Sequence, residues 1–281
     1  MRAREEIMRI VFLLCACMSI VAVAAICLFM FANGFPAMAE IGFGKFLLGT
    51  EWRPGQELFG IFPMIIGSIY VTAGAIIFGV PVGILCAVFL AHYCPKGLYT
   101  ILKPAVDLLA GIPSIVYGFF GLVVIVPAMQ AVFRTSGKGI LTASLLLGIM
   151  ILPTIISVTE ASLRAVPEAY FEGSLALGAT KERTIFRSVM VAAKSGVMSG
   201  VILGVGRAIG ETMAVIMVAG NQAAIPDSVL KGVRTLTANI VLEMGYASGL
   251  HREALIATAV VLFVFILIIN VCFSLVKRRN G

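Results

Sequence analysis

Long apolar runs divide this chain and restrict its fold more than any other feature. Only 12% of its 281 residues are charged, and its mean hydropathy is +1.07. Soluble domains carry about 25% charged residues, and about 20 apolar residues suffice for a helix to cross a bilayer. The sequence therefore predicts an all-α integral membrane protein with six transmembrane helices, at Ile10–Ala32, Leu58–Ala91, Pro104–Phe133, Gly139–Thr159, Ser195–Pro226 and Ala254–Val276.

The first run precedes "AMA" at Ala37–Ala39, as in a signal peptide, but it exceeds the roughly 7–15 residues of a signal-peptide core. We expect it to be a retained span. The chain is then divided into residues 1–57, the first helix and outer loop, and 58–276, a core domain with a cytoplasmic loop at about 160–194. Residues 277–281 form a basic cytoplasmic tail.

The positions of Lys and Arg predict the topology. If both termini are cytoplasmic, most of the 21 Lys and Arg residues lie in cytoplasmic segments, as the positive-inside rule requires. The net charge of +7 is therefore attributed to topology, and no basic patch interleaved with aromatic residues suggests nucleic acid. The six cysteines form no CxxC pair, and the two histidines stand apart, so no metal site is expected.

The longest cytoplasmic segment, Glu160–Lys194, has helix signals of its own. Pro167 suits a first helical turn, and Gly178 suits a helix end. Thr180 suits the cap of a second short helix over Lys181–Arg187. Such a helix-turn-helix is either a docking surface for another protein or an amphipathic hairpin on the membrane, and composition favours neither.

The segment from Ser195 to Pro226 places Arg207 and Glu211 among glycines in an apolar run. On a continuous helix, both charges share a face about 120° wide with most of the glycines and with Asn221. Small residues allow close helix packing, and a charge at mid-membrane costs about 2.5–3.5 kcal/mol, so a charged residue there usually serves a function. A neutral pair that only fixes packing is the alternative, and we favour a polar path. The residues assigned to close packing or a subunit interface are Gly196, Gly200, Gly204 and Gly210.

The chemistry of the pair favours an anion that carries a proton. The guanidinium of Arg207 binds oxyanions through a planar fork, whereas Glu211 would repel most anions. Phosphate retains an ionisable O–H at neutral pH that a carboxylate can accept, and sulfate has none. We therefore expect Arg207 to attract phosphate and Glu211 to select it over sulfate.

The energy source must lie outside this chain. No G-x-x-x-x-G-K-[ST] loop is present, so ATP is not bound through that motif, and the chain itself is expected to bind no cofactor. The choice is between a partner ATPase and an ion gradient in a symporter that carries a proton on Glu211. A docking loop, together with the lack of internal repeats, favours the ATPase. A membrane-embedded enzyme is disfavoured because no catalytic dyad is visible.

Two stretches carry a family resemblance. Glu172, Gly173, Ser174 and Gly178 resemble the E-A-A-x-x-x-G coupling loop of bacterial ABC importer permeases, although Gly173 and Ser174 replace alanines and the later I-x-L-P element lacks its proline. The flanking "SLRAVPEAY" and "AT" are also similar. The resemblance implies a type I importer fold in which this loop docks on a cytoplasmic ATPase. It assigns coupling to Glu168, Glu172, Gly173, Ser174, Gly178 and Ala179.

"LLAGIPSIVYGFFGLVVIVP" (Leu108–Pro127) and "GRAIGETMAVIMVAGN" (Gly206–Asn221) resemble permeases of the phosphate-specific (Pst) importers, of the PstC type. This implies a phosphate-translocating permease in the cytoplasmic (inner) membrane, not itself an enzyme. The implied partners are a PstA-type permease, two ATPase subunits that bind ATP and Mg, an extracytoplasmic phosphate-binding protein and membrane lipid. The translocation residues implied are Arg207 and Glu211, and Asn221 is expected to touch substrate near the outer end. Molybdate or sulfate is the alternative substrate. Asp107 would line the path or cap the third span, and capping is favoured.

Overall fold

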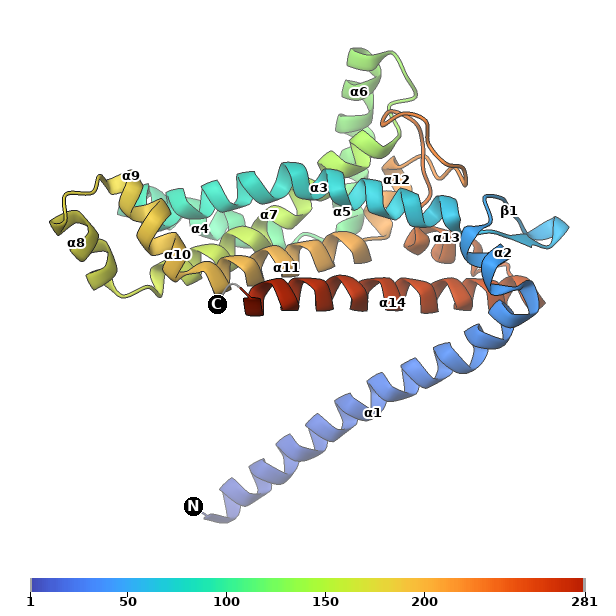
Figure 1. The fold of residues 1–281 in the computed structure, drawn as a ribbon, viewed down its shortest axis with the longest axis horizontal. Coiled ribbons are helices and arrows are strands. Elements are labelled where there is room, and N and C mark those ends of the chain that lie inside the picture. The colour runs from blue at the N-terminus through green and yellow to red at the C-terminus, as the bar shows by residue number, and fades with distance from the viewer. Residues whose placement is uncertain (1, 280–281) are drawn as a thin grey trace.

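Long helices dominate the computed structural model, which describes residues 2–279 (Figure 1). The longest are α1 (Arg2–Ile41), α3 (Phe62–Val88), α7 (Ile140–Arg164), α11 (Lys194–Gly210) and α14 (Gly249–Arg279). The shorter helices are α2 (Phe43–Leu48), α4 (Lys96–Gly111), α5 (Ser114–Phe120), α6 (Val126–Phe133), α8 (Glu168–Ala176), α9 (Lys181–Thr184), α10 (Met190–Ala192), α12 (Met213–Val218) and α13 (Leu236–Glu243). Three π-helical turns extend or join helices: η2 (Phe89–Tyr93), η3 (Gly121–Ile125) and η4 (Ile185–Val189).

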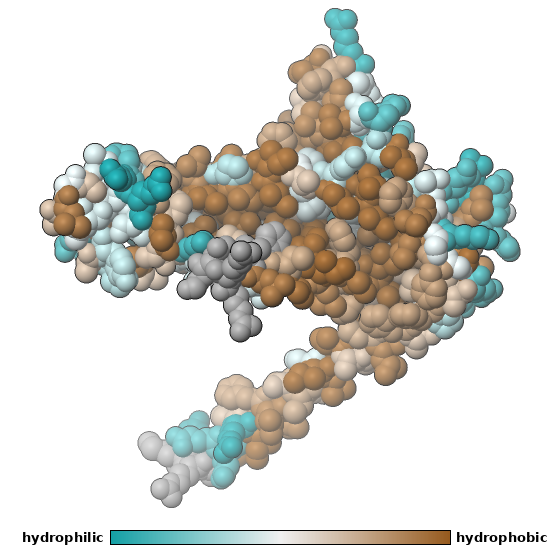
Figure 2. Space-filling model, viewed as in Figure 1, coloured by the Kyte–Doolittle hydropathy of each residue, from teal (hydrophilic) through white to brown (hydrophobic). Residues whose placement is uncertain are grey.

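Five helices of the described chain are long and apolar enough to cross a membrane, and a bent pair of helices would make a sixth. The five are Arg4–Ile41, Phe62–Tyr93, Ser114–Phe133, Ile140–Arg164 and Gly249–Cys272. The space-filling view shows an apolar band between polar ends (Figure 2). The prediction of a helical, multi-span membrane protein is therefore confirmed.

Helices α3 and α7 pack closely and form the centre of the bundle, where Val71, Ala75, Leu146 and Ile151 are buried. Close approach is possible because α3 presents glycines to α7. A Cβ atom on Gly79 would lie 2.8 Å from the side chain of Ile151. These glycines therefore serve helix packing, as small residues do in other membrane bundles.

The run expected to form the third span, Pro104–Phe133, is not one helix. Helix α4 ends at Gly111 and α5 begins at Ser114, after the extended residues Ile112 and Pro113. Proline has no N–H to donate to the preceding turn and disfavours helical backbone in the residue before it. The span starts at Ser114, and α4 is a separate helix that contacts α7.

Asp107 therefore lies within α4 and does not cap a transmembrane helix, so that expectation is wrong. Its carboxylate accepts hydrogen bonds from Lys103 at 3.0 Å and from Ser157 Oγ at 3.1 Å. The Lys103 ammonium, and to a lesser degree Ser157, holds the pKa of Asp107 below its usual range, against the opposing effect of burial. Asp107 thus helps to attach α4 to α7.

A small hairpin interrupts the otherwise helical chain between α2 and α3. Strand β1 (Trp52–Arg53) pairs antiparallel with β2 (Leu58–Phe59), around a 3-10 turn η1 (Pro54–Gln56). Trp52 and Phe59 are buried in one cluster with Phe46, Met64 and Leu255. The expected division after residue 57 therefore falls inside this hairpin, and the hairpin packs on the core domain.

The segment from Glu160 to Lys194 forms the two helices expected from its caps. Helix α8 follows Pro167, and Gly178 has the left-handed φ of +82° that favours glycine. Thr180 Oγ1 accepts a hydrogen bond from the Arg183 N–H and caps α9. Two boundaries differ from expectation. Helix α7 runs to Arg164, so Glu160 belongs to a span, and the second helix continues through η4 and α10 before a bend of 76° into α11.

In Figure 1 the starts of α1 and α9 lie toward the same end of the bundle, together with α8 and the end of α14. The hairpin, α2 and α13 lie at the other end. The start of α1 points away from the bundle, and its apolar side chains, such as Phe12 and Met18, are exposed. The start of α1, the end of α14 and the α8–α9 arm therefore share one side of the molecule.

Candidate functional site

The helix that carries Arg207 stops at Gly210, four residues after Gly206. Glu211 has extended backbone angles, and α12 begins at Met213. The carboxylate of Glu211 accepts hydrogen bonds from the N–H groups of Thr212 (3.1 Å) and Ala214 (3.2 Å). The expectation of one continuous helix from Ser195 to Pro226 is therefore wrong. The physical reason is that Glu211 satisfies the first N–H groups of a new helix, which would otherwise be unpaired.

Arg207 and Glu211 consequently do not form the helical ion pair that their spacing suggests. Arg207 is half-buried, and within residues 2–279 no carboxylate oxygen lies within 4.0 Å of its guanidinium. A guanidinium that has no counter-charge within its own chain can pair with an anion from outside the chain.

Three of the glycines in α11 face α7 of the same chain. Added Cβ atoms on Gly196, Gly200 and Gly204 would contact Ser162, Thr159 and Ile155 respectively. Gly206 and Gly210 have open space around them. The glycine seam of α11 (Gly196, Gly200 and Gly204) is therefore filled by α7, and Gly210 takes no part in it.

We expect Gly204→Val to lower the thermal unfolding temperature of the detergent-solubilised chain by several degrees. A Cβ atom there would lie 2.8 Å from Ile155 Cγ1, and the valine branch would force α11 away from α7. Gly206→Val is the matched control, because the same side chain meets no atom within 4 Å of its Cβ. Equal unfolding temperatures for the two variants would contradict this account of the seam.

Asn221 is separated from the Arg207 face by the break and by α12, so the shared face predicted for it does not exist. It has a left-handed φ of 54° after Gly220, which also has positive φ. Its Nδ2 donates to the Ile216 carbonyl at 2.8 Å, and Arg234 Nε donates to the Asn221 carbonyl at 3.1 Å. Among the described residues, its buried Oδ1 has no hydrogen-bond partner.

The residues assigned to coupling lie on α8 and on the turn that follows it. Glu168 begins α8, Glu172 is exposed, and Gly173 has open space around it. Ser174 Oγ lies 2.9 Å from Thr184 Oγ1, and the Ala179 N–H donates to the Ser174 carbonyl at 3.2 Å. Together these contacts hold α8 against α9.

The α8–α9 arm exposes two leucines. Leu177 is 91% exposed and Leu175 is 40% exposed, beside the charged Glu172 and the exposed Tyr170. Exposed apolar side chains rimmed by polar residues are typical of protein interaction sites.

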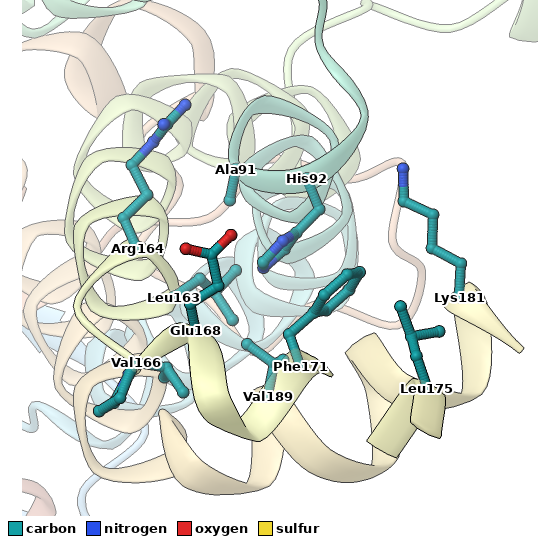
Figure 3. Close-up of a pocket in the computed structure, with 11 residues that line it drawn as sticks. Ala91, His92, Leu163, Arg164, Val166, Glu168, Phe171, Leu175, Lys181 and Val189 are labelled. Atoms are coloured by element: carbon teal, nitrogen blue, oxygen red, sulfur yellow. The ribbon is translucent and has the colours of Figure 1, made fainter. Parts of the chain in front are cut away.

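A cavity of about 560 Å³ separates α8 from the ends of α3 and α7 (Figure 3). The His92 ring stacks on Phe171 with centroids 5.9 Å apart, and the Glu168 carboxylate points into the space between Arg164 and His92. The Nε2 atom of His92 is buried without a partner in the described chain. Helix α8 is thus held at its edges, with the cavity beneath it.

Sequence reasoning did not identify Glu160, which is 3% exposed and lies four residues before the end of α7. It pairs with Arg164, accepts from Tyr99 Oη at 3.0 Å and lies 3.7 Å from Lys103 Nζ. Arg164 also donates to the Leu90 carbonyl at 2.8 Å and stacks over Tyr99. These contacts join η2, α4 and α7. The only sequence signal was a glutamate one helical turn before an arginine.

Comparison with known proteins decides the family. Residues 79–280 match the family described as "Binding-protein-dependent transport system inner membrane component". This chain belongs to that family. The permease is 37% identical to the probable ABC transporter permease protein YqgH of Bacillus subtilis. The aligned region covers 93% of this chain and 88% of that protein. It is 36% identical to the phosphate transport system permease protein PstC of Mesorhizobium japonicum, over 90% of the chain and 84% of that protein.

Solved structures share the fold of the permease. An inward-facing MetNI methionine ABC transporter structure aligns with a TM-score of 0.60 and 20% identity, over 82% of this chain and all of that one. An importer of the acidic polysaccharide alginate aligns with a TM-score of 0.62 and 16% identity, over 99% of both chains. The permease thus has the type I ABC importer fold and is a multi-pass inner-membrane protein.

Proposed function

We propose that this permease subunit translocates inorganic phosphate through an ATP-driven importer. The observation that carries the proposal is the half-buried Arg207, which has no carboxylate within 4.0 Å in the described chain. A guanidinium is the side chain best suited to a two-pronged contact with phosphate oxygens. Relatives whose names specify phosphate transport, 33–36% identical over most of the chain, support phosphate as the anion.

The partners proposed are those that the reaction requires. A second, PstA-type permease would complete the path and add positive charge, because one guanidinium does not balance a dianion. Two ATPase subunits with ATP and Mg would dock on the cytoplasmic arm, and an extracytoplasmic protein would deliver phosphate. In this arrangement α8, α9 and both chain termini lie in the cytoplasm.

The direct test is uptake of radiolabelled phosphate into vesicles that hold the assembled transporter and its binding protein. Uptake that requires ATP supports the proposal. Uptake without ATP that follows a proton gradient would instead support the ion-coupled anion symporter, and ATP-dependent uptake of molybdate or sulfate alone would replace the substrate.

Glu211→Gln tests the selective role of the carboxylate. The amide oxygen still accepts from Thr212 and Ala214, so the helix break is kept while the negative charge is removed. We expect discrimination between phosphate and sulfate to fall by about 10-fold, because a charge-assisted hydrogen bond to the phosphate O–H is worth roughly 1.5–3 kcal/mol. The measurement is competition of sulfate with radiolabelled phosphate. Unchanged discrimination in an active variant would refute the role.

A further inference from the structure

A second buried carboxylate lies at the opposite end of the bundle from the cytoplasmic arm, at the end of α13. Glu243 accepts hydrogen bonds from Trp52 Nε1 (2.8 Å) and Arg234 Nη1 (2.6 Å), and its Oε2 lies 2.9 Å from His251 Nε2. We call these four residues the Glu243 cluster. Trp52 lies in the hairpin, Arg234 in the loop before α13, and His251 in the first turn of α14. One carboxylate therefore joins four separate segments.

Burying the charge of Glu243 is unfavourable unless its hydrogen bonds and ion pairs are all formed. The side chain of Glu243 is only 9% exposed, and a buried carboxylate loses solvation that only well-placed partners offset. Arg234 is also mostly buried, with 18% of its side chain exposed. Removing the charge of one member therefore releases the other members from their positions.

The cluster holds the chain that follows α12. Arg234 Nε donates to the Asn221 carbonyl at 3.1 Å, and Arg234 Nη1 also donates to Asn239 Oδ1 at 3.0 Å. The Val233 N–H donates to the Ala219 carbonyl at 2.9 Å. Asn221 therefore keeps its left-handed conformation because Arg234 fixes it from the loop side.

The same unit reaches the break beside Arg207. Thr237 Oγ1, in the first turn of α13, donates to the Glu211 carbonyl at 3.2 Å. Thr235 caps α13 through the Ala238 N–H and lies 3.0 Å from Thr237 Oγ1. Glu243 is the last residue of this short helix, so α13 connects the Glu243 cluster to the break between α11 and α12.

We propose that Glu243 is a positioning residue for transport. Through the guanidinium fork of Arg234 and through α13, it fixes Asn221 and the break at Glu211 relative to the hairpin. It does not touch the anion. The inference rests on the proposed function, because it assigns to Glu243 the geometry of the same translocation segment.

The test uses the assembled transporter with loaded binding protein and separates the maximal uptake rate from the half-saturating concentration. We expect Glu243→Gln to lower the maximal rate at least 10-fold and to change the half-saturating concentration less than 2-fold. ATP hydrolysis without binding protein should stay within 2-fold of the unmodified transporter. The double variant Arg234→Gln/Glu243→Gln should be no slower than Glu243→Gln, because the two side chains act as one unit.

Arg234→Lys keeps a positive charge beside Glu243 and is the variant of choice if Glu243→Gln does not assemble. Lysine has no fork with which to hold both Glu243 and the Asn221 carbonyl, so the maximal rate should still fall several-fold. Trp52→Phe removes one donor and leaves the ion pair, and it should reduce the rate less than Arg234→Lys does.

An unchanged rate in an assembled Glu243→Gln or Arg234→Lys transporter would overturn the inference. So would a rate loss that only parallels a loss of assembled protein, because that result would assign the cluster to stability alone. Failure of the proposed function is seen separately, in the unmodified transporter, as uptake of another anion or uptake without ATP. The transport rates of the variants are then measured with that anion as the substrate.

Discussion

Arg207→Gln is expected to lower phosphate uptake about 100-fold while the transporter still assembles. Losing a charge-assisted contact to a desolvated anion costs roughly 2–5 kcal/mol, which corresponds to a factor of about 30 or more. Stability should not fall, because Arg207 has no carboxylate within 4.0 Å in the described chain that its removal would leave unpaired. Initial rates of radiolabelled phosphate uptake, normalised to assembled protein, measure the effect.

Two further variants show whether the fork or only the charge is needed. Arg207→Lys keeps the charge without the fork and should recover part of the lost rate. Arg252→Gln removes an exposed arginine near the start of α14 and should leave uptake unchanged. If Arg207→Gln transported at the normal rate, the guanidinium would not contact the anion and the proposed path would have to lie elsewhere.

The helices of this chain could be predicted from its sequence because their signals are local. Apolar runs longer than a bilayer indicate spans, and Gly178 and Thr180 mark the end of α8 and the start of α9 where the structure has them. The break before Ser114 also has a local signal, because Pro113 comes two residues after Gly111. The pattern "GIPS" is, however, equally typical of close packing within one span.

The break at Glu211 was harder to predict. A helical wheel assumes that the helix continues, and Arg207 and Glu211 have the spacing of an ion pair. In the structure Glu211 accepts instead from the N–H groups of α12. A glutamate four residues after an arginine carries no sequence signal that distinguishes a helical ion pair from a cap of the next helix.

The contacts of the two buried carboxylates could not be predicted in full, because one partner of each is remote in sequence. Glu160 is hydrogen-bonded to Tyr99, which is 61 residues away, and Glu243 to Trp52, which is 191 residues away. Only the packing of α4 on α7, and of the hairpin on α13 and α14, brings these groups together. Sequence patterns report on neighbours along a helix and give no account of such contacts.

Glu160→Ala is expected to cause a large loss of stability. The variant leaves Lys103 and Arg164 without their shared carboxylate and the Tyr99 hydroxyl without its acceptor. Breaking a buried ion pair from one side costs about 3–5 kcal/mol, and the lower end applies because Arg164 is half exposed. The apparent unfolding temperature of the purified chain in detergent should therefore fall by several degrees.

Glu160→Gln separates charge from hydrogen bonding. Its amide oxygen still accepts from Tyr99, so the loss should be smaller than that of Glu160→Ala. Glu182→Ala removes an exposed glutamate from α9 and should leave the unfolding temperature within a degree, because exposed charges contribute little. If Glu160→Ala unfolded at the same temperature as Glu182→Ala, α4 would be held on α7 by apolar packing and not by the contacts of Glu160.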